Sequence, residues 1–326
     1  MKNKKILITG GAGFIGSNLV DELMKDNYVI VVDNLTSGSE DAIRHHYSKH
    51  NFKFVKSDIL NYQQMEEICK SVDEIYHLAV QGVRVSLYNP IAVHEVNATG
   101  TLNMCRAALK NKVKKFIYIS SSEVYGTAVK VPMPETYPTE PMTVYGASKL
   151  AGEYYVKAFH RTYNLNTVII RPFNTYGPRE HFEGPYGEVI PKFAVRILNK
   201  KQPLIFGDGT QTRDFTYVSD TVKGIILAAN SEKLNGDVVN IAYGQEVSIN
   251  DIAKYVTQEL NSVLKPKYCK PRPGDVLRHF ADISKAKKML GFSPKIGIKD
   301  GIPLYIGWLK SQDINFSKEK DFNWEY

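Results

Sequence analysis

The stretch Thr9-Gly10-Gly11-Ala12-Gly13-Phe14-Ile15-Gly16 lies between a short apolar run and a segment of helical periodicity. Its glycines permit a tight turn, a close approach of backbone to a pyrophosphate, and close packing of the following helix on a sheet. A glycine pattern alone is weak evidence, but the strand and helix patterns that a dinucleotide-binding turn requires flank it here. We therefore predict a cofactor-binding turn whose contacts are made by Gly10, Gly13, Phe14, Ile15 and Gly16.

Asp33 ends the second apolar run, about 20 residues after the glycine-rich turn, where a carboxylate can accept hydrogen bonds from the adenosine ribose hydroxyls. The same carboxylate repels a 2′-phosphate, so the sequence favours NAD over NADP. The alternative interpretation is that Asp33 only caps a turn before Asn34.

Short β-branched runs alternate with helical patterns through the first half of the chain. This alternation predicts βαβ units and an α/β fold with a doubly wound parallel sheet of the Rossmann type. The predicted strands are 5–9, 28–32, 52–56, 74–78, 115–119 and 167–171, with a later strand near 238–242 that rejoins the sheet.

The composition changes after residue 172, where glycine, proline and aromatic residues become frequent. We expect residues 1–172 to form the NAD-binding domain and residues 173–326 to form mostly a smaller C-terminal substrate-binding domain. The polar tail after about residue 311 is expected to fray.

The composition excludes several classes of protein. The chain has 326 residues, 43% of them hydrophobic and 23% charged, which is typical of a soluble globular protein. No run approaches the ~20 apolar residues of a membrane helix, and the apolar run after the basic start is too short for a signal peptide. We therefore expect a cytoplasmic protein with no membrane partner.

Cysteines and charge narrow the possibilities further. Cys69, Cys105 and Cys269 form no CxxC pair, so we predict reduced packing thiols and no metal site. The formal net charge of +8 comes from scattered basic residues, which does not favour nucleic acid. It leaves open a merely basic surface or a small anionic ligand, such as a diphosphate, drawn into a cleft.

Tyr145 and Lys149 are separated by one helical turn, which places both side chains on one face of a predicted helix. A lysine ammonium beside a phenol stabilises the phenolate and lowers a pKa that is normally ~10. Such a tyrosine can take the proton of a substrate hydroxyl while a hydride leaves to NAD⁺. Alone, the spacing is more typical of a solvated helix face; the glycine-rich turn is what favours catalysis.

Nine motifs follow one another in order along the chain: TGGAGFIG (9–16), DNLTSG (33–38), SDI (57–59), HLA (77–79), SSSEVYG (120–126), YGASK (145–149), RPFNTYGPR (171–179), GDGTQTRDFTYVSD (207–220) and RPGD (272–275). Together they resemble the extended short-chain dehydrogenase/reductase family, specifically its nucleotide-sugar epimerases, dehydratases and decarboxylases. The resemblance runs from about residue 4 to about residue 310. It implies bound NAD, a nucleotide-sugar substrate, a 4-keto sugar intermediate, and a homodimer formed by the helical segments near 91–110 and 146–163.

The resemblance also implies roles for individual residues. Ser121 matches the hydroxyl that shares the substrate proton with Tyr145. Further cofactor contacts are implied at Asn34, Asp58, Ile59, Leu78 and Ala79. Substrate contacts are implied at Asn174, Val189, Phe206, Arg213, Arg272 and Asp275. The alternatives are a core phenylalanine, solvated arginines and a turn asparagine.

The residues Ser121-Ser122-Glu123 bear on which reaction follows the first oxidation. The similar 4,6-dehydratases typically carry Thr-Asp-Glu, where the glutamate removes the C5 proton and the aspartic acid helps water leave C6. Ser122 is a poor acid, so Glu123 or another group would have to act twice. Similar decarboxylases also carry Ser-Glu, whereas similar 4-epimerases usually lack the glutamate. The alternative for Glu123 itself is a carboxylate bound to nearby backbone.

The sequence thus favours a 4,6-dehydratase, followed by a 4-epimerase and then a UDP-glucuronate decarboxylase. A non-catalytic NAD-binding sensor is a remote alternative, and the intact Ser121, Tyr145 and Lys149 argue against it.

Overall fold

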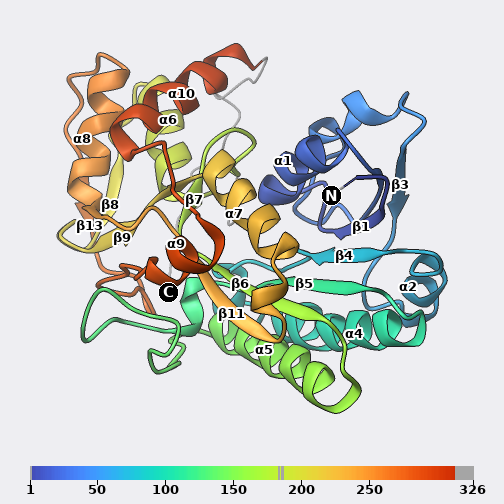
Figure 1. Cartoon of the computed structure of the whole chain (residues 1–326). Coiled ribbons are helices and arrows are strands. Elements are labelled where there is room, and N and C mark those ends of the chain that lie inside the picture. The colour runs from blue at the N-terminus through green and yellow to red at the C-terminus, as the bar shows by residue number, and fades with distance from the viewer. Residues whose placement is uncertain (1, 183, 185–186, 313–326) are drawn as a thin grey trace.

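A seven-stranded parallel sheet forms the centre of the computed structural model, which describes residues 2–182, 184 and 187–312 (Figure 1). The strand order is β11-β6-β5-β4-β1-β2-β3, and every neighbouring pair is parallel. The predicted fold class and all seven predicted strands are confirmed. The strands are β1 (Lys5–Thr9), β2 (Tyr28–Asp33), β3 (Phe52–Lys56), β4 (Glu74–His77), β5 (Lys115–Ile119), β6 (Thr167–Pro172) and β11 (Asp237–Ile241).

Helices cover both faces of this sheet, which is why most residues of its central strands are apolar and buried. On β1, Ile6 and Ile8 pack toward α1 (Phe14–Leu23) and α7 (Val218–Asn230). Leu7 points to the opposite face, because successive side chains of a strand alternate. That face is covered by α2 (Tyr62–Ile68), α4 (Thr101–Lys110) and α5 (Val144–Tyr163), with α3 (Pro90–His94) and the π-helical turns of Glu95–Gly100 leading into α4.

The later part of the chain forms a second layer beside the carboxyl end of the sheet (Figure 1). Its helices α6 (Val189–Leu198), α8 (Ile249–Glu259) and α10 (Ile298–Ser311) share an apolar core that includes Phe193, Ile252 and Ile306. Short strand pairs complete the layer: β7 (Thr175–Tyr176) with β10 (Thr216–Tyr217), β8 (Leu204–Phe206) with β13 (Lys267–Cys269), and β9 (Thr212–Asp214) with β12 (Glu246–Ser248). The helix α9 (Ser284–Leu290) packs against β11.

Strand register brings the predicted site loops to one edge. Thr9 is paired with Val32 on one side and with His77 on the other, so the loops after β1, β2 and β4 leave the sheet at the same level. Ligands of open parallel sheets bind at this edge.

Other expectations concern the surface and the thiols. No helix in the described part of the chain is long and apolar enough to cross a membrane. As predicted, Cys69, Cys105 and Cys269 are free thiols, and burial raises the pKa of Cys69 to about 12, so this thiol is inert. The predicted frayed tail lies almost entirely outside the described residues.

Candidate active site

A cleft of about 500 Å³ lies where the loops of the sheet meet the second layer. Every site residue predicted from the sequence lines it, from the glycine-rich turn to the RPGD motif. They are Gly10, Gly13, Phe14, Ile15, Gly16, Asp33, Asn34, Asp58, Ile59, Leu78, Ala79, Ser121, Ser122, Glu123, Tyr145, Lys149, Asn174, Val189, Phe206, Arg213, Arg272 and Asp275.

The glycine-rich turn is too crowded for side chains. Gly10 has a φ of +71°, and a Cβ on it would lie 2.7 Å from the Ala79 nitrogen. A Cβ on Gly16 would lie 2.1 Å from the Gly10 oxygen. The helix α1 begins directly after Gly13, so its first N–H groups, which have no partner within the helix, open onto the cleft. This arrangement suits a pyrophosphate.

Asp33 caps a turn, which is one of the two roles considered for it, and its position leaves the ribose-binding role as a prediction. Its Oδ1 accepts a hydrogen bond from the Leu35 N–H at 2.8 Å, as in a turn cap, and its Oδ2 accepts one from Ala12 at 3.0 Å. The carboxylate also lines the cleft, and burial raises its pKa against these two hydrogen bonds. Asn34 donates to Asp58 at 2.8 Å, which joins the loops after β2 and β3.

Tyr145 and Lys149 lie in the first turns of α5, whose N-cap Thr143 accepts a hydrogen bond from Gly146. The expected lowering of the tyrosine pKa is wrong for the protein by itself. Burial raises the pKa of Tyr145 to about 12, although the Ser121 hydroxyl opposes this. Lys149 donates instead to the Ile119 carbonyl, and burial lowers its pKa to about 7. Because burial disfavours the ammonium form, Lys149 supplies less of the positive charge that was expected to lower the pKa of Tyr145.

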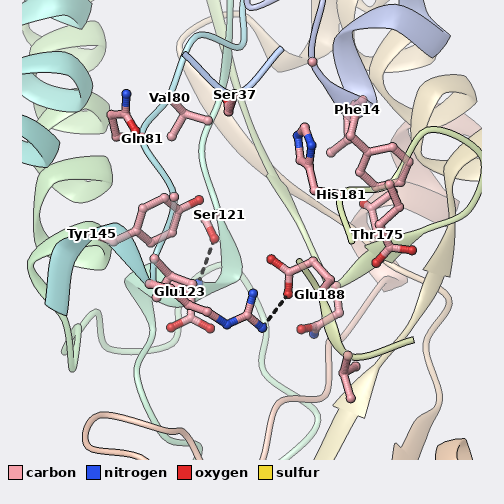
Figure 2. A pocket seen from close by; sticks show the side chains of 18 of the residues that line it. Phe14, Ser37, Val80, Gln81, Ser121, Glu123, Tyr145, Thr175, His181 and Glu188 are labelled. Carbon is pink, nitrogen blue, oxygen red and sulfur yellow. Dashed lines mark hydrogen bonds and ion pairs between the residues drawn. The ribbon is translucent and has the colours of Figure 1, made fainter. Parts of the chain in front are cut away.

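Ser121, Glu123 and Tyr145 line the same side of the cleft, with Glu188, Thr175 and His181 across from them (Figure 2). Ser121 caps the short helix Ser122–Val124 by accepting the Glu123 N–H at 3.2 Å.

Burial raises the pKa of Glu123 to about 7. The charges of Arg213 and Arg84 lower this pKa, and those of Asp275 and Glu188 raise it further. A carboxyl group with this pKa can both take and give a proton near neutral pH.

The far end of the cleft is basic and aromatic. Arg213 on β9 pairs with Asp275 at 3.1 Å, and the Arg272 guanidinium lies 3.7 Å from the centre of the Phe206 ring. Asn174 donates to the Asp214 carbonyl at 3.4 Å. Positive charge beside a flat aromatic surface suits a nucleoside diphosphate.

The sequence reasoning missed several residues of the cleft. Arg84 pairs with Glu188 at 3.1 Å and also bonds the Gly187 carbonyl, so it links the loop after β4 to the entrance of α6. Glu180 is buried beside them, and burial raises its pKa well above its usual range. Arg84 could have been found, because it follows the HLA motif at a strand end; the two glutamates lie in loops without periodicity.

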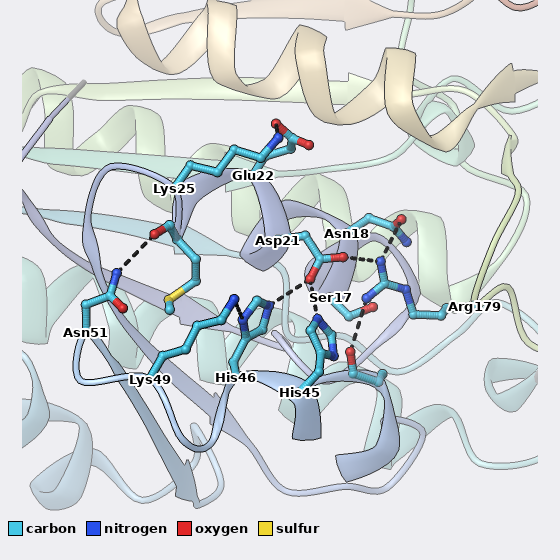
Figure 3. Close-up of polar contacts among 12 residues, drawn as sticks. Ser17, Asn18, Asp21, Glu22, Lys25, His45, His46, Lys49, Asn51 and Arg179 are labelled. Carbon is cyan, nitrogen blue, oxygen red and sulfur yellow. Dashed lines mark hydrogen bonds and ion pairs between the residues drawn. The ribbon is translucent and has the colours of Figure 1, made fainter.

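A polar cluster lies around Asp21 of α1 (Figure 3). Asp21 on α1 accepts hydrogen bonds from His45 at 2.8 Å, from His46 at 2.7 Å, and from Arg179. These are metal-ligating residue types, but Lys49 lies 3.0 Å from His46 Nδ1 and Arg179 occupies the second carboxylate oxygen. Two cations beside the ligand atoms oppose a divalent ion. We interpret the cluster as a structural set of hydrogen bonds that fixes the loop after β7 against α1.

Comparison with known proteins places this architecture. A family described as GDP-mannose 4,6 dehydratase matches residues 7–304. The chain belongs to this family. The chain's relatives are nucleotide-sugar enzymes of the extended short-chain dehydrogenase/reductase family, so the predicted family is confirmed.

Proteins similar to this family member carry out three different reactions. A UDP-N-acetylglucosamine 4-epimerase from Methanobrevibacter ruminantium M1, solved with UDP-N-acetylmuramic acid, is 37% identical, with 95% of this chain and 99% of that chain covered and a TM-score of 0.90. UDP-glucuronic acid decarboxylase 2 of Arabidopsis thaliana is 34% identical over 98% of this chain and 71% of its own length. A dTDP-glucose 4,6-dehydratase from Streptomyces venezuelae, solved with NAD, is 29% identical, with 94% and 97% covered and a TM-score of 0.89. This family member is therefore an enzyme of the nucleotide-sugar epimerase, decarboxylase and dehydratase group.

Proposed function

We propose that this protein is an NAD-dependent nucleotide-sugar 4,6-dehydratase. The observation that carries the proposal is the Glu123 carboxyl group, which lies in the cleft with Ser121 and Tyr145 and has a pKa raised by burial to about 7. Abstraction of a proton from C5 of a 4-keto sugar needs a base at this place, and a base works best when its pKa lies near the operating pH.

The cleft fits NAD at the N-terminus of α1 and at the glycine-rich turn, where a Cβ on Gly10 or Gly16 would clash with backbone. Asp33 would accept hydrogen bonds from the adenosine ribose through the lone pairs that its backbone contacts leave. When bound, NAD would supply a hydride acceptor for C4 and a hydride donor for C6, and its positive charge would favour the phenolate form of Tyr145.

Tyr145 and Glu123 each carry out part of the proton transfers. Tyr145, bridged by Ser121, takes the proton of the C4 hydroxyl as the C4 hydride leaves. Glu123 next takes the C5 proton, which the C4 ketone has made acidic. Because Ser122 is a poor acid, Glu123 passes this proton to the C6 hydroxyl, which leaves as water. The hydride then returns to C6, and the proton that Tyr145 took from the C4 hydroxyl passes through Glu123 to C5, which completes a 4-keto-6-deoxy sugar and restores both residues.

A 4-epimerase is the second candidate. It is favoured by the UDP-N-acetylglucosamine 4-epimerase, which is more similar in sequence than the dehydratase described above. The serine at 122 in place of an acid also agrees with it. In this case the 4-keto sugar turns over in the cleft, the hydride returns to the other face of C4, and Glu123 does not exchange a proton with the substrate.

A panel of UDP-, GDP-, dTDP- and CDP-sugars with product analysis by mass spectrometry tests the proposal. Loss of water supports the dehydratase, unchanged mass with altered stereochemistry supports the epimerase, and loss of carbon dioxide supports a decarboxylase. Tyr145→Phe should abolish all three, because each begins with the same oxidation. Bound NAD without turnover of any sugar would support the sensor instead.

We also infer a homodimer. Tyr88, Ile91 and Tyr154 are 54%, 67% and 59% exposed, and α3 packs against α5 on the outer surface, so apolar side chains remain uncovered there. A surface of this kind is suited to pairing across a two-fold axis.

A further inference from the structure

One buried nitrogen close to Glu123 has no role in the mechanism above. His279 lies in the segment between β13 and α9, and its side chain is fully buried. Its Nε2 lies 2.8 Å from the Gly126 carbonyl oxygen, which only accepts hydrogen bonds, so Nε2 carries the ring proton. Its Nδ1 is then an acceptor, and in the described part of the chain it has no hydrogen-bond partner.

This Nδ1 faces Glu123. The distance from Nδ1 to Oε1 of Glu123 is 3.8 Å, and His279 has no other carboxylate within ion-pair distance among the described residues. When Glu123 is ionised, two lone pairs face each other. When Glu123 is protonated, a small movement lets its O–H donate to Nδ1. The buried Nδ1, which otherwise costs free energy because it lacks a hydrogen bond, then has a partner.

The ring is held firmly in this orientation. Gly126 belongs to the same segment as Glu123, and its φ of +69° and the 2.0 Å distance from a Cβ on it to the Glu140 oxygen fix that turn. On the other side, the His279 backbone N–H donates to the Thr212 carbonyl at 3.2 Å. The acceptor and the carboxyl group therefore belong to two segments that meet only in the folded chain.

We propose that His279 is a positioning residue that accepts a hydrogen bond from protonated Glu123, and so makes Glu123 a stronger base for the C5 proton. The interaction favours the protonated carboxyl group, which is the state Glu123 reaches after taking that proton. The catalytic part of this proposal rests on the dehydratase function; the interaction itself does not.

The other charged groups around the pair do not replace this role. Glu123 is also influenced by Arg213 and Arg84, which favour its ionised form, and by Asp275 and Glu188, which favour its protonated form. His279 stays neutral, since burial lowers its pKa to about 3 and the Arg213 charge adds to this effect. It therefore accepts the hydrogen bond without taking the proton.

Infrared spectroscopy of the enzyme without substrate tests the interaction. The carbonyl band of protonated Glu123 is identified by its loss in Glu123→Gln and is followed as a function of pH. His279→Phe keeps a ring but removes the acceptor, and it should raise the acid ionisation constant of Glu123 about tenfold, as expected for the loss of one hydrogen bond. His279→Gln is the matched control: its amide can donate to Gly126 and accept from Glu123, so the parent value should largely return.

Equal midpoints in the parent and the phenylalanine variant would overturn the proposal, as would a glutamine variant that behaves like phenylalanine. If the phenylalanine variant does not fold, the parent protein with ¹⁵N-labelled histidine decides. As the pH is changed, the His279 Nδ1 resonance should then shift with the same midpoint as the carbonyl band of Glu123. A resonance whose position does not change as Glu123 titrates would refute the interaction. Because no substrate is present, these results do not depend on which reaction the enzyme catalyses. C5 exchange in deuterium oxide tests the catalytic part separately: its pH profile should move to lower pH in His279→Phe.

Discussion

Replacement of Glu123 by glutamine separates oxidation at C4 from the chemistry that follows it. The substitution keeps the size of the side chain but removes the base. Binding of substrate and reduction of NAD⁺ should persist, since Tyr145 and Lys149 are untouched, and the keto intermediate should accumulate. Loss of a general base commonly costs ~10²–10⁴ in rate.

The pH dependence of the parent enzyme follows from the pKa of Glu123, which burial raises to about 7. Only the ionised carboxylate can take the C5 proton, so the rate of C5 exchange should rise with pH. A group with this pKa is ionised to about 9% at pH 6 and about 91% at pH 8, so the rate should rise about tenfold between them. Above pH 8 the increase should level off.

The assay is incorporation of deuterium at C5 of the substrate in deuterium oxide, read by mass spectrometry, together with the absorbance of reduced cofactor. In Glu123→Gln the exchange should disappear while the absorbance develops. Normal turnover in this variant, with no deuterium at C5 in the parent, would refute the role of Glu123 as base and favour the epimerase.

Four further predictions concern other parts of the molecule. Asp33→Ala should weaken NAD binding measured by calorimetry, and NADP binding to the parent that is as tight as NAD binding, or tighter, would contradict the argument. Arg213→Ala should mainly raise KM through loss of charge-assisted bonds to a diphosphate; a fall in kcat alone would assign Arg213 to the transition state. Glu153→Gln breaks the fully buried ion pair with Arg171, whose two contacts are 2.8 and 2.6 Å. It should lower the free energy of unfolding in urea titrations by roughly 3–5 kcal/mol. A loss below about 1 kcal/mol would show that the guanidinium finds other partners. The protein should have a dimeric mass in solution at micromolar concentration, with Ile91→Glu shifting it to a monomer, and a monomeric parent would remove the inferred interface.

Much of the secondary structure of this protein is determined by local sequence, and the sequence by itself was enough to predict it. The β-branched runs and the helical segments between them follow from the alternation of side chains along strands and helices, so all seven strands were predicted close to their observed bounds. The glycine-rich turn was also predictable, since a side chain at Gly10 or Gly16 would clash with backbone at this strand–helix junction. The family resemblance carried by the ordered motifs named the site residues, and all of them line one cleft in the structure.

What only the tertiary structure decided depends on burial and on contacts between distant segments. The spacing of Tyr145 and Lys149 predicted a lowered tyrosine pKa, but packing removed water from both groups and directed the lysine to the Ile119 carbonyl. The meeting of Glu123 with His279 is likewise invisible in the sequence. Periodicity describes neighbours along one element, whereas the dielectric environment of a charge and the partner of a loop residue are set by how separate elements close over one another.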